Sequence, residues 1–375
     1  MIRPKRTLRK KNSPKVVLLG PISIGGFSVV WNGRTTAKNV AVKQIRVRNK
    51  AKRSRRWRRV KPRLINLRAK PMLRKQAKEE IELLQLSQSR FVLHLYDCFE
   101  IGRSYWLVTE QCVCHLRSIK EKKSPKRPTT PPQLIYHVVF PIFLAVSHLH
   151  SLGIVHRDIK IENVLLTSNG VPKLCDFGMA KRFSDEKTPI GRGQLFGSRY
   201  YMAPEVVQLS EYSMKVDTWA LGALLVLLFY HDGRLRGWRE FARFYRKGYK
   251  ECEPDTLQDS LYSQWEIRPT YEIPLERHEL FQFIKKLLIF SPNERPTVTQ
   301  LCNDDFFVEK YLPWKRRNSD DFRNRHHILR LALKRNQVFI QDNTGKNFQP
   351  RTNFQKLQWT MKETLWHFST FLYPV

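Results

Sequence analysis

The first 78 residues contain no aspartate or glutamate, although they include 26 lysines and arginines. The chain has 375 residues and a formal net charge of +35, and most of this excess precedes Glu79, the first acid. A field of one sign attracts polyanions such as nucleic acid, acidic proteins or anionic membrane. A compositional bias of the genome, which tolerates solvated lysine and arginine, would explain the same charge, so both interpretations stay open.

Other absences exclude whole classes of protein. The longest apolar run, Ala220 to Tyr230, is far too short to cross a bilayer and predicts a buried helix. The six cysteines show no metal-ligand spacing, because Cys112 and Cys114 are too close for the usual zinc pair. No signal-peptide pattern precedes them, so we expect reduced thiols in an intracellular protein.

The composition favours a globular protein of more than one part. A hydrophobic share of 41% with 22 phenylalanines and 9 tryptophans argues against disorder. The length exceeds that of most single domains, which predicts two lobes or a domain with extensions. We find no internal repeat.

Apolar alternation and turn residues predict a small antiparallel sheet in the first third of the chain. The expected strands begin at residue 16 and cover residues 23–30 (two strands and a tight turn), 40–43, 91–99 and 105–109. A helix is expected from near Leu73, with Ile81, Leu83 and Leu84 turned inward. Residues 46–75 carry 15 lysines and arginines without one acid, and we interpret them as an insertion before that helix.

The rest of the chain is expected to be mainly helical. Residues 121–132 form a proline-rich basic loop, and residues 179–202 an irregular one. Helices are expected at 134–152, 214–230, 277–289 and 297–307, and residues 154–178 are expected to form a strand, a loop and a strand. Scattered aromatic residues in the tail, 311–375, favour docking onto the domain or a partner over disorder.

Two short segments supply the groups that phosphoryl transfer needs. HRDIKIEN (156–163) offers a base, a cation and a metal-binding amide in one loop. DFG (176–178) begins thirteen residues after Asn163 and offers a carboxylate that can hold Mg²⁺ against a nucleotide phosphate. Catalysis of phosphoryl transfer is mostly positioning and charge neutralisation, which this set provides.

With these motifs in order over residues 16–310, the chain resembles a eukaryotic-type serine/threonine protein kinase. The resemblance implies an α+β bilobal fold, with a small, mainly β N-lobe (16–110, including the basic insert) and a larger, mainly α C-lobe (111–310). Residues 1–15 become a basic N-terminal extension and 311–375 a C-terminal extension. The implied reaction moves the γ-phosphate of Mg-ATP to serine or threonine hydroxyls of protein substrates, with ATP and Mg²⁺ as cofactors.

The resemblance also implies roles for single residues. Asp158 matches the catalytic base, and Lys160 the lysine that neutralises the moving phosphoryl group. Asn163 completes the catalytic set, and Asn163 with Asp176 matches the two magnesium ligands. A lone aspartate more often lies in a surface turn or caps a helix. Asp158, Asn163 and Asp176 all stand at the motif positions, which argues against that interpretation.

The implied nucleotide site begins with Lys43, which matches the strand lysine that grips the α- and β-phosphates. A buried lysine needs a carboxylate partner. Glu80 is the expected partner, with Glu79 and Glu82 as neighbouring alternatives. The full set of nucleotide-site residues is Ser23, Gly25, Val30, Ala41, Lys43, Glu80, Glu110, Cys112 and Leu165. Cys112 and Cys175 either line this site or are small buried hydrophobes.

The phosphate-covering loop departs from the family's Gly-x-Gly-x-x-Gly, because its three positions hold Ser23, Gly25 and Ser28. Glycine lets backbone N–H groups approach phosphates closely, so the change predicts modestly weaker ATP binding. A pseudokinase scaffold with a polyanion-binding basic N-lobe is therefore the rival hypothesis. The basic insert contains the single aromatic residue Trp57, so it lacks the regular aromatic spacing with which proteins stack on single-stranded nucleic acid. Two roles stay open for it: nonspecific binding to nucleic acid, or nuclear import through KRSRRWRR (52–59). That basic run favours the nucleus over the cytoplasm.

Further matches concern support, regulation and substrates. Glu205 of the Ala-Pro-Glu anchor is expected to pair with Arg295, and Asp217 to hold the catalytic loop. Arg157 is expected to receive a phosphate on Ser184 or Thr188. Arginine-directed relatives place an acid shortly after the hinge, but this chain has Leu116 at that position. Glu162 is the remaining acid, and Arg192 and Arg199 lie near the substrate loop, so we expect acidic or neutral substrates. Subfamily, physiological substrate, upstream activator and oligomeric state stay open.

Overall fold

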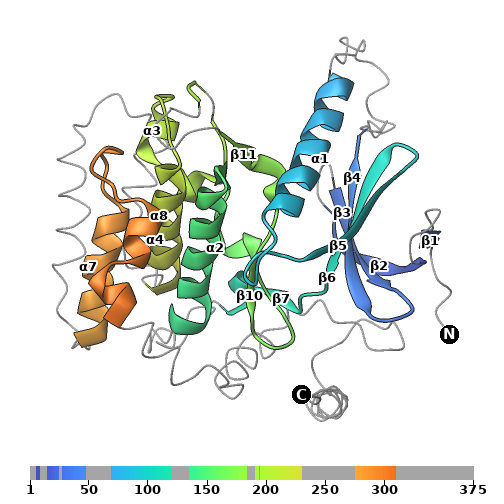
Figure 1. Ribbon diagram of the computed structural model, residues 1–375, viewed down its shortest axis with the longest axis horizontal. Coiled ribbons are helices and arrows are strands. Elements are labelled where there is room, and N and C mark those ends of the chain that lie inside the picture. The colour runs from blue at the N-terminus through green and yellow to red at the C-terminus, as the bar shows by residue number, and fades with distance from the viewer. Residues whose placement is uncertain are drawn as a thin grey trace, which may run out of the picture.

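A six-stranded antiparallel sheet forms the N-terminal part of the molecule, in the order β1-β2-β3-β4-β6-β5 (Figure 1). The computed structural model describes residues 6–8, 15–24, 28–47, 69–119, 135–183, 191–193, 195–229 and 275–309. The strands of the sheet are β1 (Arg6–Leu8), β2 (Val16–Ile24), β3 (Ser28–Arg34), β4 (Asn39–Arg46), β5 (Leu95–Ile101) and β6 (Ser104–Glu110).

The two faces of this sheet pack into different cores, because successive side chains of a strand point to opposite faces. Val40 and Val42 of β4 are buried with Trp106 and Val108 of β6 on one face. Ala41 and Lys43 therefore lie on the other face, which α1 (Ala69–Leu86) covers.

Helix α1 turns one face toward the sheet, with Ala77, Ile81 and Leu84 buried at helical spacing. Glu80 lies on the same face and is 8% exposed, which brings a carboxylate to the sheet. The helix begins at Ala69 and not near Leu73. Pro71 permits the earlier start, since the first turn of a helix does not use its N–H groups.

The C-terminal part is mainly helical, which confirms the expected α+β architecture with a mainly β and a mainly α lobe. Its main helices are α2 (Phe140–Ser151), α4 (Lys215–Phe229), α7 (Leu275–Leu287) and α8 (Val298–Cys302). Helices α2 and α4 are buried nearly all round, because α2 packs on α8 and α4 packs on α7 (Figure 1). Trp219, Phe143 and Phe283 fill the core between them.

Short elements between the lobes carry the motif residues. They are β7 (Cys114–His115), η2 (Leu116–Ile119), β8 (Ile154–Val155), η4 (Ile161–Asn163), β9 (Val164–Leu166), β10 (Pro172–Leu174), η5 (Phe177–Met179), β11 (Lys181–Arg182), η6 (Arg199–Tyr201) and α3 (Pro204–Val207). Strands β7, β9 and β10 form one small sheet, and β8 pairs with β11. The expected strand, loop and strand over 154–178 is confirmed as β8, a loop with η4, β9 and β10.

Several predicted bounds were wrong. The stretch 91–99 becomes strand only at Leu95, with Val92 forming an isolated bridge to Leu174. The helix expected at 134–152 opens with a π-turn, η3 (Ile135–Val139), because Pro141 has no N–H to continue an α-helical ladder. The stretch 297–307 is divided, since α8 ends at Cys302 and helical structure resumes at 305–309.

The N-terminal extension and the basic insert also differ from expectation. Strand β1 lies inside residues 1–15 and pairs with β2. The insert range 46–75 overlaps β4 at Arg46 and α1 from Ala69. Residues 48–68, the loop 121–132 and the tail 311–375 lie outside the described residues, as does the tight turn at 25–27. Polyanion binding and nuclear import therefore stay predictions.

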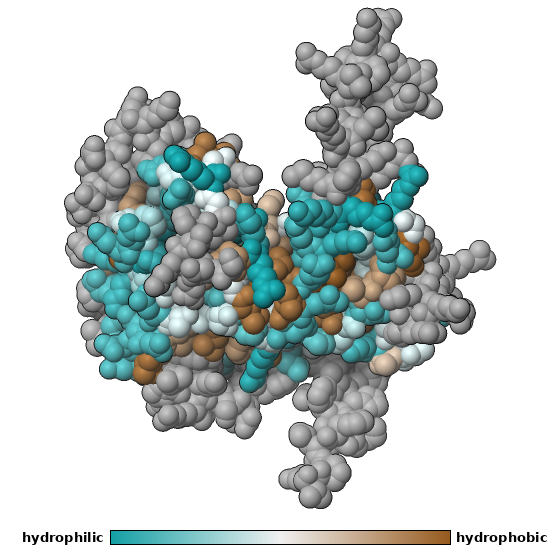
Figure 2. Space-filling model, turned by 45° about the horizontal axis from the view of Figure 1, so that its top comes forward, coloured by the Kyte–Doolittle hydropathy of each residue, from teal (hydrophilic) through white to brown (hydrophobic). Residues whose placement is uncertain are grey.

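Figure 2 shows apolar residues along the junction of the two parts, with hydrophilic surface on either side. Among the described residues, no helix has both the length and the apolarity needed to span a bilayer.

Candidate active site

Asp217, in the first turn of α4, holds the loop that contains the HRD motif. Its Oδ2 accepts a hydrogen bond from the His156 N–H at 2.8 Å, and its Oδ1 accepts one from the Arg157 N–H at 2.9 Å. His150 Nε2 lies 3.0 Å from Oδ2. Burial alone would raise the pKa of Asp217, but these hydrogen bonds outweigh it and the pKa is lowered. The expected anchoring of the loop is confirmed, and Arg157 takes a left-handed backbone with φ of 64° within it.

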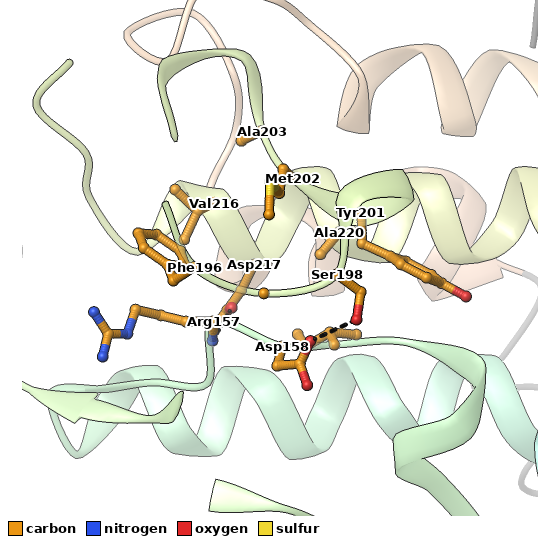
Figure 3. A pocket seen from close by; sticks show the side chains of 12 residues that line it. Arg157, Asp158, Phe196, Ser198, Tyr201, Met202, Ala203, Val216, Asp217 and Ala220 are labelled. Carbon is orange, nitrogen blue, oxygen red and sulfur yellow. Dashed lines mark hydrogen bonds between the residues drawn. The ribbon is translucent and has the colours of Figure 1, made fainter. Parts of the chain in front are cut away.

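Asp158 lies at the centre of a small polar network, of which Figure 3 shows the contact with Ser198. Lys160 Nζ donates to Oδ2 at 2.5 Å, and the Ser198 hydroxyl donates to Oδ1 at 3.1 Å. The Asn163 amide donates to Oδ2 at 3.1 Å and to the Asp158 carbonyl at 2.8 Å. Three donors reach the carboxylate of a residue that is only 8% exposed, so these contacts fix the direction of the carboxylate.

Lys43 joins the sheet, helix α1 and the DFG motif. Its Nζ lies 2.6 Å from Glu80 Oε1 and 2.7 Å from Asp176 Oδ1. Burial acts to lower the pKa of Lys43, but the two carboxylates outweigh it and raise the pKa above its ordinary value. The Lys43 ammonium in turn lowers the pKa of Asp176 to about 2.

Helix periodicity explains why Glu80 is the partner and its neighbour is not. Glu79 is exposed and lies 3.7 Å from Lys75, one turn earlier on the outer face of α1. Glu80 shares the inward face with Ala77 and Ile81. The predicted pairing of Lys43 with Glu80 is confirmed.

The DFG segment turns sharply at Asp176, which has a φ of 68° and a ψ of 78°. Phe177 is buried behind it and packs edge-on against His156, with ring centroids 5.2 Å apart. A Cβ at Gly178 would lie 3.4 Å from both Asp176 Oδ1 and Glu80 Oε2, so glycine lets the carboxylates approach the segment closely.

Two oxygens near Asp158 have the character that a magnesium ion prefers. Within the described residues, Asn163 Oδ1 and Asp176 Oδ2 have no hydrogen-bond partner, because the Asn163 amide and Asp176 Oδ1 make the contacts above. The described residues contain no cluster of three or more His, Cys, Asp or Glu that could hold a metal ion alone. The residues fit a cation that takes its other ligands from a nucleotide phosphate and water.

Strand register gathers the expected nucleotide-site residues of the sheet on one face. Val30 pairs with Lys43, and Ala41 pairs with Thr109, so all four share the face that carries the lysine. Ser23 lies opposite Val30 near the end of β2, and Gly25 lies outside the described residues. Leu165 comes from β9 of the other lobe and is half-buried.

The side chains of the hinge residues contact or pack against the rest of the protein. Glu110 Oε1 lies 2.8 Å from Lys173 Nζ and accepts the His94 N–H at 2.7 Å, and the Glu110 N–H donates to the His94 carbonyl at 3.0 Å. Burial raises the pKa of the Cys112 and Cys175 thiols. Cys112 is buried, which favours its interpretation as a small buried hydrophobe, whereas Cys175 is half-buried.

The loop facing Asp158 is held by a buried ion pair and by one glycine. Arg295 donates to Glu205 Oε1 at 2.7 Å and to Oε2 at 3.0 Å, which confirms the expected pair. Gly197 has a φ of +80°, and a Cβ there would lie 2.6 Å from the Arg157 carbonyl oxygen. Glycine therefore allows Ser198 to reach Asp158, and a small pocket lies between these two loops (Figure 3).

Arg157 already has partners from the protein itself. Its Nε donates to the Met179 carbonyl at 2.6 Å and its Nη1 to the Tyr212 hydroxyl at 2.9 Å. The guanidinium also lies 4.9 Å from the centroid of the Phe196 ring. Ser184 and Thr188 lie outside the described residues, so the phosphate contact stays a prediction.

Sequence reasoning missed two partners. Ser198 links Asp158 to Lys160, whose Nζ lies 3.1 Å from its hydroxyl, and its place after Gly197 was the available signal. Lys173 pairs with Glu110, which is 63 positions earlier in the chain, and no local sequence pattern predicts that contact.

Comparison with known proteins agrees with this geometry. The family model described as "Protein kinase domain" matches residues 17–307. The chain belongs to the protein kinase family. It is 31% identical over 229 residues to the serine/threonine-protein kinase cst-1 of Caenorhabditis elegans, covering 61% of this chain and 42% of that protein. It is 29% identical over 236 residues to the serine/threonine-protein kinase plk-2 of the same organism, covering 63% of this chain and 33% of the relative. The serine/threonine-protein kinase RUNKEL of Arabidopsis thaliana is 31% identical over 235 residues, 62% of this chain and 16% of its own length. The chain thus spans less than half the length of these relatives.

Proposed function

We propose that this kinase-family protein is an active enzyme that transfers the γ-phosphate of Mg-ATP to serine and threonine hydroxyls of proteins. The observation that carries the proposal is the meeting of Lys43, Glu80 and Asp176 beside the network around Asp158. We assign the kinase domain to residues 16–310, with extensions at 1–15 and 311–375.

Asp158 is the proposed base. An acceptor hydroxyl that approaches Asp158 donates a hydrogen bond to its carboxylate and gives up its proton as the phosphoryl group arrives. The Ser198 and Lys160 contacts hold the carboxylate in one orientation. Lys160 also places a positive charge where negative charge gathers on the transferred group.

Lys43 is the proposed phosphate ligand of the nucleotide, and Glu80 fixes its ammonium group in place. Asn163 and Asp176 supply the oxygens that would hold Mg²⁺. When bound, the metal ion neutralises phosphate charge and orients the γ-phosphate toward the acceptor. Val30, Ala41 and Leu165 supply the apolar surface for adenine, and the Glu110–Cys112 backbone supplies its hydrogen bonds.

The rival proposal is a scaffold with this fold and no turnover. The serines at positions 23 and 28 of the phosphate-covering loop motivate it. The intact contacts of Lys43, Asp158, Asn163 and Asp176 favour the enzyme, because a scaffold does not need a base aligned with a metal-binding pair.

The test combines nucleotide binding with phosphate analysis. The full chain is incubated with Mg-ATP and casein, and mass spectrometry identifies phosphoserine and phosphothreonine on casein. The proposal predicts both products with the wild type and a loss of at least about 100-fold in rate with Asp158→Ala. Binding of Mg-ATP by the wild type without any transfer to protein would support the scaffold instead.

A further inference from the structure

Each described acid from the hinge to the DFG motif has a basic partner. Among the described residues 104–119 and 135–183 there are four carboxylates, and each lies within 2.9 Å of a lysine or arginine nitrogen. The pairs are Glu110–Lys173, Asp158–Lys160, Glu162–Arg117 and Asp176–Lys43. Lys43 and Lys160 belong to the proposed catalytic machinery and Lys173 of β10 holds the hinge residue Glu110, but the role of Arg117 is unassigned.

Glu162 lies where residues beside the acceptor must pass. It follows Lys160 by two positions in η4, within the loop that presents Asp158. The neighbouring Ile161 N–H donates to the Tyr201 hydroxyl at 3.3 Å, and Tyr201 belongs to the same loop as Ser198 (Figure 3). A segment whose hydroxyl reaches Asp158 therefore extends over the turn that carries Glu162.

Arg117 binds one of the two carboxylate oxygens of Glu162, and the other oxygen is buried. Glu162 Oε2 is buried and has no hydrogen-bond partner within the described residues. Oε1 accepts from Arg117 Nη1 at 2.9 Å. A basic side chain on a substrate could pair only with Oε1, where it competes with an arginine of the same chain. The Arg117 side chain, at 61% exposed, keeps further N–H donors toward solvent.

We propose that Arg117 is a specificity-determining residue that neutralises Glu162 and selects acceptor segments flanked by acidic residues. The proposal rests on the function proposed above and names its substrate class. An exposed ion pair stabilises a fold very little, so its main effect is on the charge that the site presents. The pair carries no net charge, where an unpaired glutamate would be negative, and the exposed Arg117 side chain keeps N–H donors free for an acidic residue of the substrate.

The test compares three serine peptides of equal length with acidic, neutral or basic flanking residues. The wild type is expected to have a higher kcat/KM for the acidic peptide than for the basic one. Arg117→Ala should move this ratio toward the basic peptide by about fivefold, the scale of one exposed charge pair. Arg117→Glu should move it further in the same direction, and adding Glu162→Gln to Arg117→Ala should cancel the shift.

Two controls separate this effect from general ones. Arg103→Ala removes the same charge from an exposed turn between β5 and β6, and the ratio should change by less than about twofold. Turnover of the neutral peptide reports the proposed function itself. If the wild type phosphorylates no peptide, the proposed function fails, and peptide affinities measured by fluorescence anisotropy still test the charge preference.

Two results would overturn the proposal. One is a wild type that favours the basic peptide. The other is an Arg117→Ala variant with a lower melting temperature and an unchanged ratio, which would make the pair a local brace between η2 and η4.

Discussion

Glu205 and Arg295 form a buried, two-pronged ion pair between residues 90 positions apart. Their side chains are 3% and 0% exposed, and Arg295 also donates to the Ile289 and Phe290 carbonyls. The pair fixes the loop that brings Ser198 to Asp158 against the helices of the C-lobe. Stability and active-site geometry are therefore linked through this contact.

Removing one member of that pair should strongly destabilise the protein. We predict that Glu205→Ala lowers the free energy of unfolding by about 3–5 kcal/mol, because it leaves a buried guanidinium without its carboxylate. Urea denaturation measures the change. The matched control is Glu79→Ala, which breaks the exposed contact with Lys75 at 3.7 Å and should cost less than about 1 kcal/mol. Equal effects of the two substitutions would contradict the account.

Gly197 should tolerate no side chain, for a reason that differs from ordinary backbone preference. Both Gly197 and Gly102 have positive φ, but a Cβ at Gly102 would meet nothing within 4 Å, whereas one at Gly197 would lie 2.6 Å from a carbonyl oxygen. Gly102→Ala should cost about 1 kcal/mol, the typical penalty of left-handed backbone. Gly197→Ala should cost more in thermal unfolding and should also reduce phosphate transfer. Similar losses at both positions would show that the close approach to Arg157 is unimportant.

The contact of Asp176 with Lys43 should appear in the pH dependence of stability. The pKa of Asp176 is about 2 in the folded protein, below its ordinary value of 3.8. A carboxyl with a depressed pKa stabilises the fold above its unfolded pKa, and this contribution is lost as the pH falls through the folded pKa. The difference in unfolding free energy between wild type and Asp176→Asn should therefore shrink from about pH 4 to about pH 2. A difference that grows over this range would contradict the contact.

Tyr212 should support Arg157 independently of any phosphate. Tyr212→Phe removes the hydroxyl that accepts from Arg157 Nη1 at 2.9 Å and should lower stability by about 0.5–1.5 kcal/mol. It should also speed amide hydrogen exchange at residues 195–198, because the Phe196 ring packs on Tyr212 and Arg157. Tyr96→Phe is the control, since that ring is partly exposed and keeps its contact with Lys38. Unchanged exchange in Tyr212→Phe would show that the hydroxyl has no positioning role.

The sequence predicted the parts of the site that depend on local order. Asp158, Asn163 and Asp176 stand in two short motifs, so their approach follows from one loop and one turn. Glu80 was predictable because helix periodicity separates it from Glu79. The strand face of Val30, Ala41 and Lys43 follows from alternation alone.

Contacts between segments distant in the chain could not be predicted from the sequence. Arg117 and Glu162 are 45 positions apart, and Arg157 and Tyr212 are 55 apart, with no repeat or motif that joins them. The N-terminal strand β1 was missed because a short basic segment carries no strand pattern of its own, and its pairing depends on the edge of β2. Prolines at 71 and 141 shifted helix starts through backbone hydrogen bonds that apolar periodicity does not report.

The most direct test of the central claim is the rate of γ-phosphate transfer by an Asp158→Asn variant that still binds Mg-ATP. Asparagine keeps the size of the side chain and removes its ability to accept a proton. The account predicts nucleotide affinity close to that of the wild type, with phosphate transfer to protein slowed at least about 100-fold. Transfer at the wild-type rate by Asp158→Asn would contradict the assignment of Asp158 as the base and the mechanism built on it.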